Sequence, residues 1–97
     1  MKKSMQFTRG GQRNGTGLVG HVETTYEDLI EAFGLPYERN GDKTTCEWVL
    51  TFGDGQVATI YDWKMPRTPM GKYMWHIGGK DASVVDRIET HVLMVTV

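Results

Sequence analysis

The pattern of hydrophobic and polar positions predicts one helix with particular clarity. Apolar side chains recur at the spacing of a single helix face in the set Tyr26, Leu29, Ile30 and Phe33. Thr24 is followed three residues later by Glu27, which is the spacing of a capping box at a helix start. Gly34 and Pro36 are typical of a helix end. The pattern therefore predicts a helix over about residues 25–33.

A β-hairpin is predicted around the Asp-Gly pair at residues 54–55, which favours a two-residue turn between strands. With these two residues as the loop, Phe52 pairs with Val57 and Glu47 pairs with Asp62. One face of the hairpin is then aromatic and apolar, and the other carries Val49, Ala58 and Ile60. Because both faces need some burial, the hairpin is expected near the centre of a sheet, with a helix covering one side.

Three further strands are indicated by weaker patterns. Two are expected at residues 5–8 and 18–22, and a third at residues 72–77, where the break at residues 78–80 ends it. The glycine-rich stretch at residues 9–20 reads as a loop, or as strands interrupted by bends. It is either a bend with two exposed arginines or a flexible arm that wraps a phosphate or a partner.

A second helix is expected to begin at Asp81 or Ser83 and to end at about His91. The apolar end of the chain, residues 93–97, is expected to pack as a last short strand or a tail. The order strand, helix, hairpin, strand, helix predicts the α+β class. The expected architecture is a mostly antiparallel sheet, centred on the Asp-Gly hairpin and packed with two helices, in one domain of residues 1–97.

Length and composition bound the class of protein. Ninety-seven residues suffice for one domain, and a formal net charge of −1 excludes a cationic DNA-coating protein and a strongly acidic DNA mimic. The single cysteine, Cys46, excludes an internal disulfide and argues against a cysteine-based zinc site. No apolar run is long enough to span a bilayer, and the basic start lacks the apolar stretch of a signal peptide. A soluble protein of a reducing compartment is expected, with residues 1–5 loosely held.

The charges are unevenly distributed along the chain. Residues 23–54 hold eight acidic and two basic side chains, whereas residues 61–80 hold four basic side chains and one acidic one. The basic segment also contains four Tyr and Trp residues, and such a mixture suits an anionic ligand that carries rings. Alternatively, the aromatic side chains form the core and the lysines are a solvated rim. The candidate ligand-binding residues are Trp63, Lys64, Arg67, Lys72, Trp75, His76, Gly78, Gly79 and Lys80.

The glycine pair Gly78 and Gly79 is the sharpest local feature of that segment. Two glycines between a strand and a helix start allow backbone N–H groups to point at a bound anion, and Lys80 would add a charge. The glycine spacing is not that of a nucleotide-hydrolysing phosphate loop. The alternative is a plain turn that requires two small residues.

Evidence for catalysis or for metal binding is weak. Glu47 and Asp62, opposite each other in the expected hairpin, could act as an acid–base couple. The three histidines have no paired metal-ligand spacing, and Cys46 is expected to be buried and unreactive. No catalytic residue, metal or cofactor is therefore assigned, and a non-enzymatic protein is expected.

Several stretches of the chain resemble a widespread family of small bacteriophage proteins that has no assigned activity. They are residues 22–29, 42–49, 54–64 and 75–79, of which Trp-His-Ile-Gly-Gly at 75–79 and Val-Ala-Thr-Ile-Tyr-Asp-Trp-Lys at 57–64 are the most distinctive. The resemblance spans roughly residues 15–91. It implies a phage protein that acts in the host bacterial cytoplasm, and it carries over no catalytic residue.

The leading functional hypothesis is a phage counter-defence protein that binds and sequesters a nucleotide-derived immune signal. In it Trp63 and Trp75 stack on bases, while Arg67, Lys72 and Lys80 pair with phosphates, in a site that a homo-oligomer could share. One alternative is an anti-CRISPR-type inhibitor that contacts a host defence protein through the acidic segment, at Glu23, Glu27, Glu31 and Glu38. Another is a small enzyme that degrades the signal with Glu47, Asp62 and His76. No membrane partner is expected.

Overall fold

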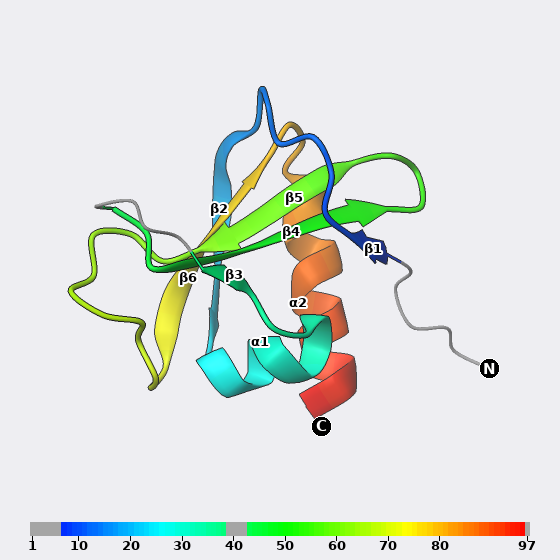
Figure 1. Cartoon of the computed structure of the whole chain (residues 1–97). Helices are drawn as coiled ribbons and strands as arrows, with labels where there is room; N and C mark the ends of the chain where they lie inside the picture. Colours follow the sequence, from blue (N-terminus) through cyan, green and yellow to red (C-terminus); the bar gives the residue numbers. More distant parts are fainter. Residues whose placement is uncertain (1–6, 39–42, 97) are drawn as a thin grey trace.

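The predicted hairpin lies at the centre of an antiparallel β-sheet (Figure 1). The computed structural model describes residues 7–38 and 43–96. Within these ranges the sheet has six strands and the chain has two helices, which confirms the α+β class. The elements are β1 (Phe7–Arg9), β2 (Gly17–Thr24), α1 (Tyr26–Phe33), β3 (Tyr37–Glu38), β4 (Cys46–Phe52), β5 (Val57–Tyr61), β6 (Tyr73–Gly79) and α2 (Ser83–Thr96).

The strands follow the order β1-β4-β5-β6-β2, and β3 pairs with β4 on the same edge as β1. The consecutive strands β1 and β2 therefore lie at opposite ends of the sheet, and residues 10–16 cross its width. Two 2.7 Å hydrogen bonds fix the start of this crossing: Gly10 N–H donates to Val49 O, and Thr51 Oγ1 donates to Gly10 O. The far end of the crossing lies beside the side chain of Lys80, which follows β6.

Both helices lie against the same face of the sheet, as Figure 1 shows. Alternation along the strands sends one set of side chains toward the helices, and this set forms the core with α1 and α2. The other set faces away from the helices, and we call that side the helix-free face. From β4, β5, β6 and β2 it carries the side chains of Glu47, Val49, Thr51, Val57, Thr59, Tyr61, Met74, His76, His21 and Glu23.

The hairpin turn has one residue more than predicted. Phe52 N–H donates to Gln56 O and Gly55 N–H donates to Phe52 O, each at 2.9 Å, so the loop is the three residues 53–55. Gly55 has φ 90°, the left-handed position of a three-residue turn with a bulge. Thr51 therefore pairs with Val57, and the predicted pairing of Phe52 with Val57 is wrong. Because a one-residue slip reverses which face each side chain joins, the predicted faces of β5 are exchanged.

Helix α1 confirms the predicted helix, with its start moved by one residue. The N-cap is Thr25, whose side chain accepts a 3.1 Å hydrogen bond from Asp28 N–H. Thr24 stays in β2 opposite Tyr73, and its hydroxyl donates to the Asp28 carboxylate at 3.0 Å. Gly34 ends the helix as predicted, with φ 87° and its N–H donating to a carbonyl of the last turn.

Helix α2 continues beyond the predicted end at His91 as far as Thr96. Residues 93–96 are therefore helical, and the expectation of a last strand or tail is corrected; Val97 lies outside the described residues. The helical apolar spacing simply persists in this segment, since Val84, Ile88 and Val92 are buried and Val95 packs against the same core.

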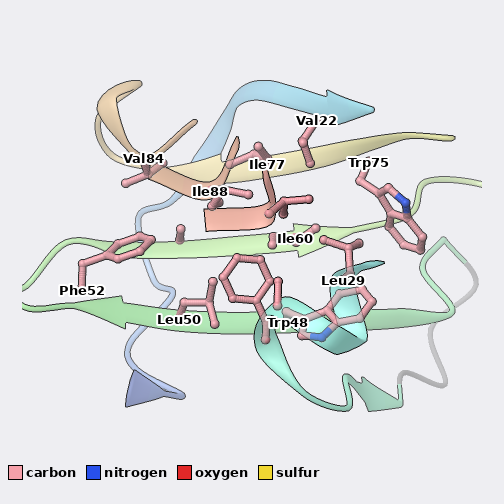
Figure 2. Close-up of a cluster of buried hydrophobic side chains, with 14 of the residues drawn as sticks. Val22, Leu29, Trp48, Leu50, Phe52, Ile60, Trp75, Ile77, Val84 and Ile88 are labelled. Atoms are coloured by element: carbon pink, nitrogen blue, oxygen red, sulfur yellow. The ribbon is translucent and has the colours of Figure 1, made fainter. Parts of the chain in front are cut away.

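Two tryptophans occupy one end of the core, as the close-up in Figure 2 shows. Trp48 and Trp75 are both fully buried, and their rings meet edge to face with centroids 5.5 Å apart. Both indole N–H groups have carbonyl partners: Trp48 donates to Gly34 O at 2.8 Å, and Trp75 donates to Thr24 O at 3.2 Å. These hydrogen bonds link the sheet to both ends of α1, and they satisfy donors that burial would otherwise leave unpaired.

The N-terminal strand predictions are confirmed in position and altered in length. β1 begins at Phe7, and β2 extends over Gly17–Thr24 rather than residues 18–22. The expectation for residues 1–5, and the first two residues of the strand predicted at 5–8, lie outside the described residues. Neither α1 nor α2 is long and apolar enough to cross a membrane.

Candidate ligand-binding site

A row of polar and aromatic side chains crosses the helix-free face. The strand registers place Glu47 opposite Tyr37 and Tyr61, Tyr61 opposite His76, and His76 opposite His21. We call these residues the cross-strand row, which runs from β3 through β4, β5 and β6 to β2. Because directly opposite side chains on one face of a sheet lie within contact distance, the sheet itself assembles the row.

The aromatic half of the row is closely packed. The His76 ring stacks on Tyr61 with centroids 5.4 Å apart, and it meets His21 edge-on at 4.7 Å. Trp63 follows β5 and extends the cluster, with its ring centroid 6.2 Å from Tyr61 and 6.3 Å from His76. Tyr73 fixes Trp63 from the start of β6, because its hydroxyl accepts a 3.0 Å hydrogen bond from Trp63 N–H.

Trp63 is the exposed member of this cluster and lies between two lysines. Its side chain is 41% exposed, and the ammonium groups of Lys43 and Lys64 lie 5.6 Å and 6.0 Å from its ring centroid. Both distances suit cation–π attraction. Lys64 N–H donates to Lys43 O at 2.7 Å, which joins the segment before β4 to the segment after β5. An accessible aromatic ring thus carries two positive charges beside it.

The backbone of Lys64 is strained. Its φ of 56° lies in the left-handed region, which costs a non-glycine residue roughly 1–2 kcal/mol. This conformation turns the chain away from β5 directly after Trp63. Strain of this kind persists where surrounding contacts enforce it, and it often accompanies binding sites.

The other half of the row is built around an ion pair. Glu47 is 8% exposed, and its carboxylate accepts a hydrogen bond from the Arg13 guanidinium in the crossing segment 10–16. Arg9 is also held by the protein: its guanidinium donates to Phe33 O at 3.1 Å and to Leu35 O at the end of α1. Both arginines of the glycine-rich stretch are therefore exposed but contact the folded chain.

Burial changes the pKa of two members of the row. Burial and the neighbouring His21 lower the pKa of His76 below its usual value, while Asp62 partly opposes this shift. His76 is therefore neutral near pH 7, and its buried Nδ1 has no hydrogen-bond partner in the described structure. Burial raises the pKa of Tyr61, and the Glu47 carboxylate adds to the effect. Neutral His76 and Tyr61 therefore lie beside the ion pair of Glu47 with Arg13.

The structure brings only some of the predicted site residues together. Trp63, Lys64 and His76 lie in one cluster on the helix-free face. Arg67 and Lys72 are exposed on the loop that joins β5 to β6, the same loop that carries Trp63 and Lys64. The loop between β5 and β6 therefore presents an aromatic ring and basic side chains that a ligand could reach.

The expectation that Trp75 stacks on a ligand is corrected. Trp75 is fully buried on the helix side of the sheet, beside Trp48. Its ring also meets Tyr73 edge to face at 5.1 Å, and its indole N–H is occupied by Thr24 O. For Trp75 the alternative of a core aromatic is therefore the right one, because β6 alternation points it toward the helices.

The glycine pair does not form an anion-binding turn. Gly78 and Gly79 belong to β6, between β5 and β2, so their N–H groups face neighbouring strands. A Cβ on Gly78 would collide with Thr59 Oγ1, and one on Gly79 would lie 2.9 Å from Val84 Cγ2. Both glycines are therefore required by close packing in the sheet. Lys80 comes directly after Gly79, the last residue of β6, whereas Tyr73 is the first. Lys80 is therefore at the far end of this strand from the Trp63 cluster, which Tyr73 contacts.

The predicted acid–base couple of Glu47 and Asp62 is also absent, since Glu47 faces Tyr61. Asp62 is fully buried and acts as a structural acceptor. It receives 2.8 Å and 2.7 Å hydrogen bonds from the backbone N–H and hydroxyl of Thr45, and a longer one from Cys46 N–H. The one-residue error in hairpin register accounts for this correction.

Sequence reasoning overlooked three members of the cluster: Lys43, Tyr61 and His21. Lys43 is 20 positions before Trp63, in the segment judged acidic, and no local pattern links the two. Tyr61 and His21 could have been found from the correct registers, which place both beside His76. The missing signal was therefore the pairing of strands and not the residue types.

The remaining histidine and the cysteine have structural roles. His91 is buried, and its Nε2 donates a 2.9 Å hydrogen bond to Ala32 O, which joins the two helices. Cys46 is also buried, and burial raises the pKa of its thiol, so it is a poor nucleophile. Residues 7–38 and 43–96 contain no group of three or more His, Cys, Asp or Glu side chains placed to hold a metal ion.

Comparison of the chain with family models, with curated proteins and with solved structures finds no match. The resemblance to the phage family therefore stays an expectation, and the geometry around Trp63 is the basis for the functional argument.

Proposed function

We propose that this protein binds a nucleotide-derived, anionic ligand on the helix-free face, around Trp63. The observation that carries this proposal is the exposed Trp63 ring with the ammonium groups of Lys43 and Lys64 beside it. A backbone hydrogen bond between Lys64 and Lys43 joins the two segments that supply these lysines. A base stacks on an aromatic face with about 1–3 kcal/mol of binding energy, and phosphates pair with Lys or Arg. Arg67 and Lys72 on the same loop would supply further positive charge.

The biological role we propose is sequestration of an immune signal by a phage counter-defence protein in the host cytoplasm. The phage context rests on the sequence resemblance alone. A binding role is favoured over degradation because the helix-free face lacks the carboxylate couple that hydrolysis was expected to use. The cluster is open to solvent at Trp63, so a second copy that shares the ligand would enclose it more completely.

The test is thermal unfolding against a panel of cyclic oligonucleotides and NAD-derived signals. A ligand at a hundred times its dissociation constant adds about 2.7 kcal/mol to the free energy of unfolding, which shifts the midpoint by several degrees. Heating the complex should release the ligand unchanged, whereas an enzyme would return a product. No shift with any member of the panel would contradict ligand binding.

Variants localise the site. Trp63→Ala and the double variant Lys43→Gln with Lys64→Gln are expected to abolish the shift while leaving the unliganded midpoint nearly unchanged, because these side chains are exposed. Lys80→Gln is the control for each single Lys→Gln change, since it removes one positive charge at the far end of β6 from Tyr73. Equal loss of binding in the control would show that only bulk charge matters.

A second candidate is direct contact with a host defence protein through the acidic segment. Glu23, Glu27 and Glu31 are exposed on β2 and α1, which favours this candidate; the side chain of Glu38 lies outside the described residues. Charge reversal at these positions would weaken such a complex and leave the Trp63 site intact. Co-purification of a host protein that is lost on charge reversal would support it.

A further inference from the structure

The strand β2 forms one edge of the sheet, and no further strand among the described residues pairs with its outer side. The other edge is formed by the short strands β1 and β3, which together cover β4. The eight-residue β2 pairs only with β6, so its outer edge presents unpaired N–H and C=O groups. The register of β2 is irregular between Leu18 and Gly20 and regular from Gly20 to Thr24. The regular part is a template for an added strand, and β2 contains no Lys, Arg or Pro that would discourage one.

A groove runs beside this edge, between β2 and α2. It has a volume of about 300 Å³ and is lined by Val22, Glu23, Glu89, Val92 and Leu93. Leu93 is 62% exposed although it is a large apolar residue, while Val22 and Val92 form the groove's buried wall. A strand added to β2 would place alternate side chains over this groove, because strand neighbours lie about 4.8 Å apart and alternate in direction.

The charge of the groove restricts what can occupy it. Glu89 is exposed beside the groove on α2, and the exposed Glu23 side chain lies next to it along β2 but on the helix-free face. The nearest cation on α2, Arg87, is held by the Asp54 carboxylate. An added strand alternates its side chains between the two faces, so its apolar side chains would reach the floor beside Glu89 and the intervening ones would lie near Glu23. This arrangement suits a segment in which an apolar side chain is flanked by Lys or Arg.

We propose that β2 accepts an extended basic segment of a partner protein as an additional antiparallel or parallel strand, with one apolar side chain of that segment in the groove. A second copy of this chain fits less well. Antiparallel pairing of β2 with a second β2 would set Glu23 opposite Leu18, and β2 supplies no cation to neutralise Glu23 or the Glu89 beside the groove. The groove is lined by none of Trp63, Lys43 and Lys64, and His21 is the one cluster member on β2, so variants at Trp63 separate this inference from the ligand site.

The test uses fluorescein-labelled peptides of about nine residues, long enough to span β2. One alternates Lys with Val, a second alternates Glu with Val, and a third alternates Lys with Ser. Fluorescence anisotropy with the full chain is expected to show binding of the Lys/Val peptide only, weakened by salt because exposed charges contribute. Amide NMR shifts on binding should map to β2 and to α2 near Leu93.

Glu89→Lys is expected to weaken the Lys/Val peptide about tenfold, and Leu93→Ser to weaken it by a similar factor. Both residues are exposed, so the fold should be unaffected. Asp86→Lys is the matched control, because it also replaces an exposed carboxylate of α2 by an ammonium group but lies outside the groove lining. The Trp63→Ala variant should bind the peptide normally, which separates failure here from failure of the ligand proposal.

Three results would overturn the proposal. Equal binding of the Lys/Val and Glu/Val peptides would show that Glu23 and Glu89 do not favour a basic segment. Amide NMR shift changes that fall outside β2 would show that the peptide binds at another surface. A dimer in sedimentation, with the β2 amides already protected from exchange, would assign the edge to a second copy of the chain.

Discussion

His21 and His76 lie directly opposite each other on β2 and β6, with ring centroids 4.7 Å apart. Neither ring is fully exposed, and Tyr61 covers the other side of His76. Protonation of His76 would therefore place a charge in a partly buried aromatic cluster beside a second titratable ring.

This arrangement predicts that stability falls on the acidic side of neutrality. Because the pKa of His76 is lowered by burial and by His21, the folded protein binds this proton more weakly than the unfolded chain does. The contribution of His76 is complete above the unfolded pKa of about 6.5 and is lost as the pH falls from there toward the lower folded pKa. Denaturant unfolding between about pH 7.5 and pH 5 should show the loss.

The variant His76→Phe keeps a ring against Tyr61 and should remove part of the pH dependence in that window. In NMR titration, His21→Phe should raise the pKa of His76 only partly toward its usual value, because burial remains the larger cause. Identical pH profiles for the parent and His76→Phe would contradict the assignment.

The two tryptophans predicted as ligand contacts should behave oppositely on substitution. Trp75→Ala removes a fully buried ring, so it should lower the free energy of unfolding by about 3–5 kcal/mol. Trp63→Ala removes a half-exposed ring and should lower it by less than about 1 kcal/mol while abolishing ligand binding. Urea denaturation and ligand titration of the pair measure both effects. Large destabilisation by Trp63→Ala would make Trp63 a structural residue instead.

The hairpin turn offers a test of its backbone geometry with a matched control in the same loop. Gly55→Ala forces a Cβ into a left-handed backbone at φ 90°, so we expect a loss of about 1–2 kcal/mol. Gly53→Ala, in the same turn, lacks a positive φ and has open space around its Cβ, so it should change stability far less. Equal effects of the two substitutions would show that Gly55 does not hold this left-handed backbone.

Close packing around Gly78 and Gly79 predicts that substitution there lowers the free energy of unfolding whether or not a ligand is bound. Gly79→Ala brings a Cβ within 2.9 Å of Val84 Cγ2 and should lower the free energy of unfolding by about 1–3 kcal/mol through overpacking. The double variant Gly79→Ala with Val84→Ala should recover part of this loss, because the opposing methyl groups are then absent. A stable Gly79→Ala protein that has lost ligand binding would restore the anion-binding interpretation.

The strained backbone at Lys64 predicts that a substitution there raises stability and lowers ligand affinity. Lys64→Gly relieves a left-handed backbone and should raise the free energy of unfolding by up to about 1 kcal/mol, while ligand affinity falls because a charge beside Trp63 is lost. Lys72→Gly removes the same charge from the same loop but not at a positive φ, so it should not stabilise. Destabilisation by Lys64→Gly would show that no strain is relieved.

The sequence predicted the elements well where their signals are local. The cap and apolar face of α1, its glycine stop and the existence of the hairpin each depend on residues within a few positions of one another. The end of α2 was missed although its apolar spacing continues through Val95, because that segment reads equally well as a strand.

The candidate site was predicted only in part, and the hairpin register explains most of the difference. A single additional residue in the turn decides whether Glu47 faces Asp62 or Tyr61, and the sequence pair at 54–55 is compatible with either loop length. The same alternation separates Trp63, exposed beside Lys64, from Trp75, buried beside Trp48. Residue type alone cannot distinguish the two tryptophans.

By itself, then, the sequence determined the α+β class and the position of α1 to within one residue, and it indicated a basic aromatic segment as the candidate ligand site. Tertiary structure decided which of those side chains are accessible, joined Lys43 to Trp63, and left the β2 edge beside an acidic groove. The physical reason is that caps and periodicity are short-range. Strand register and the face that the helices cover are set by contacts between residues far apart in the chain.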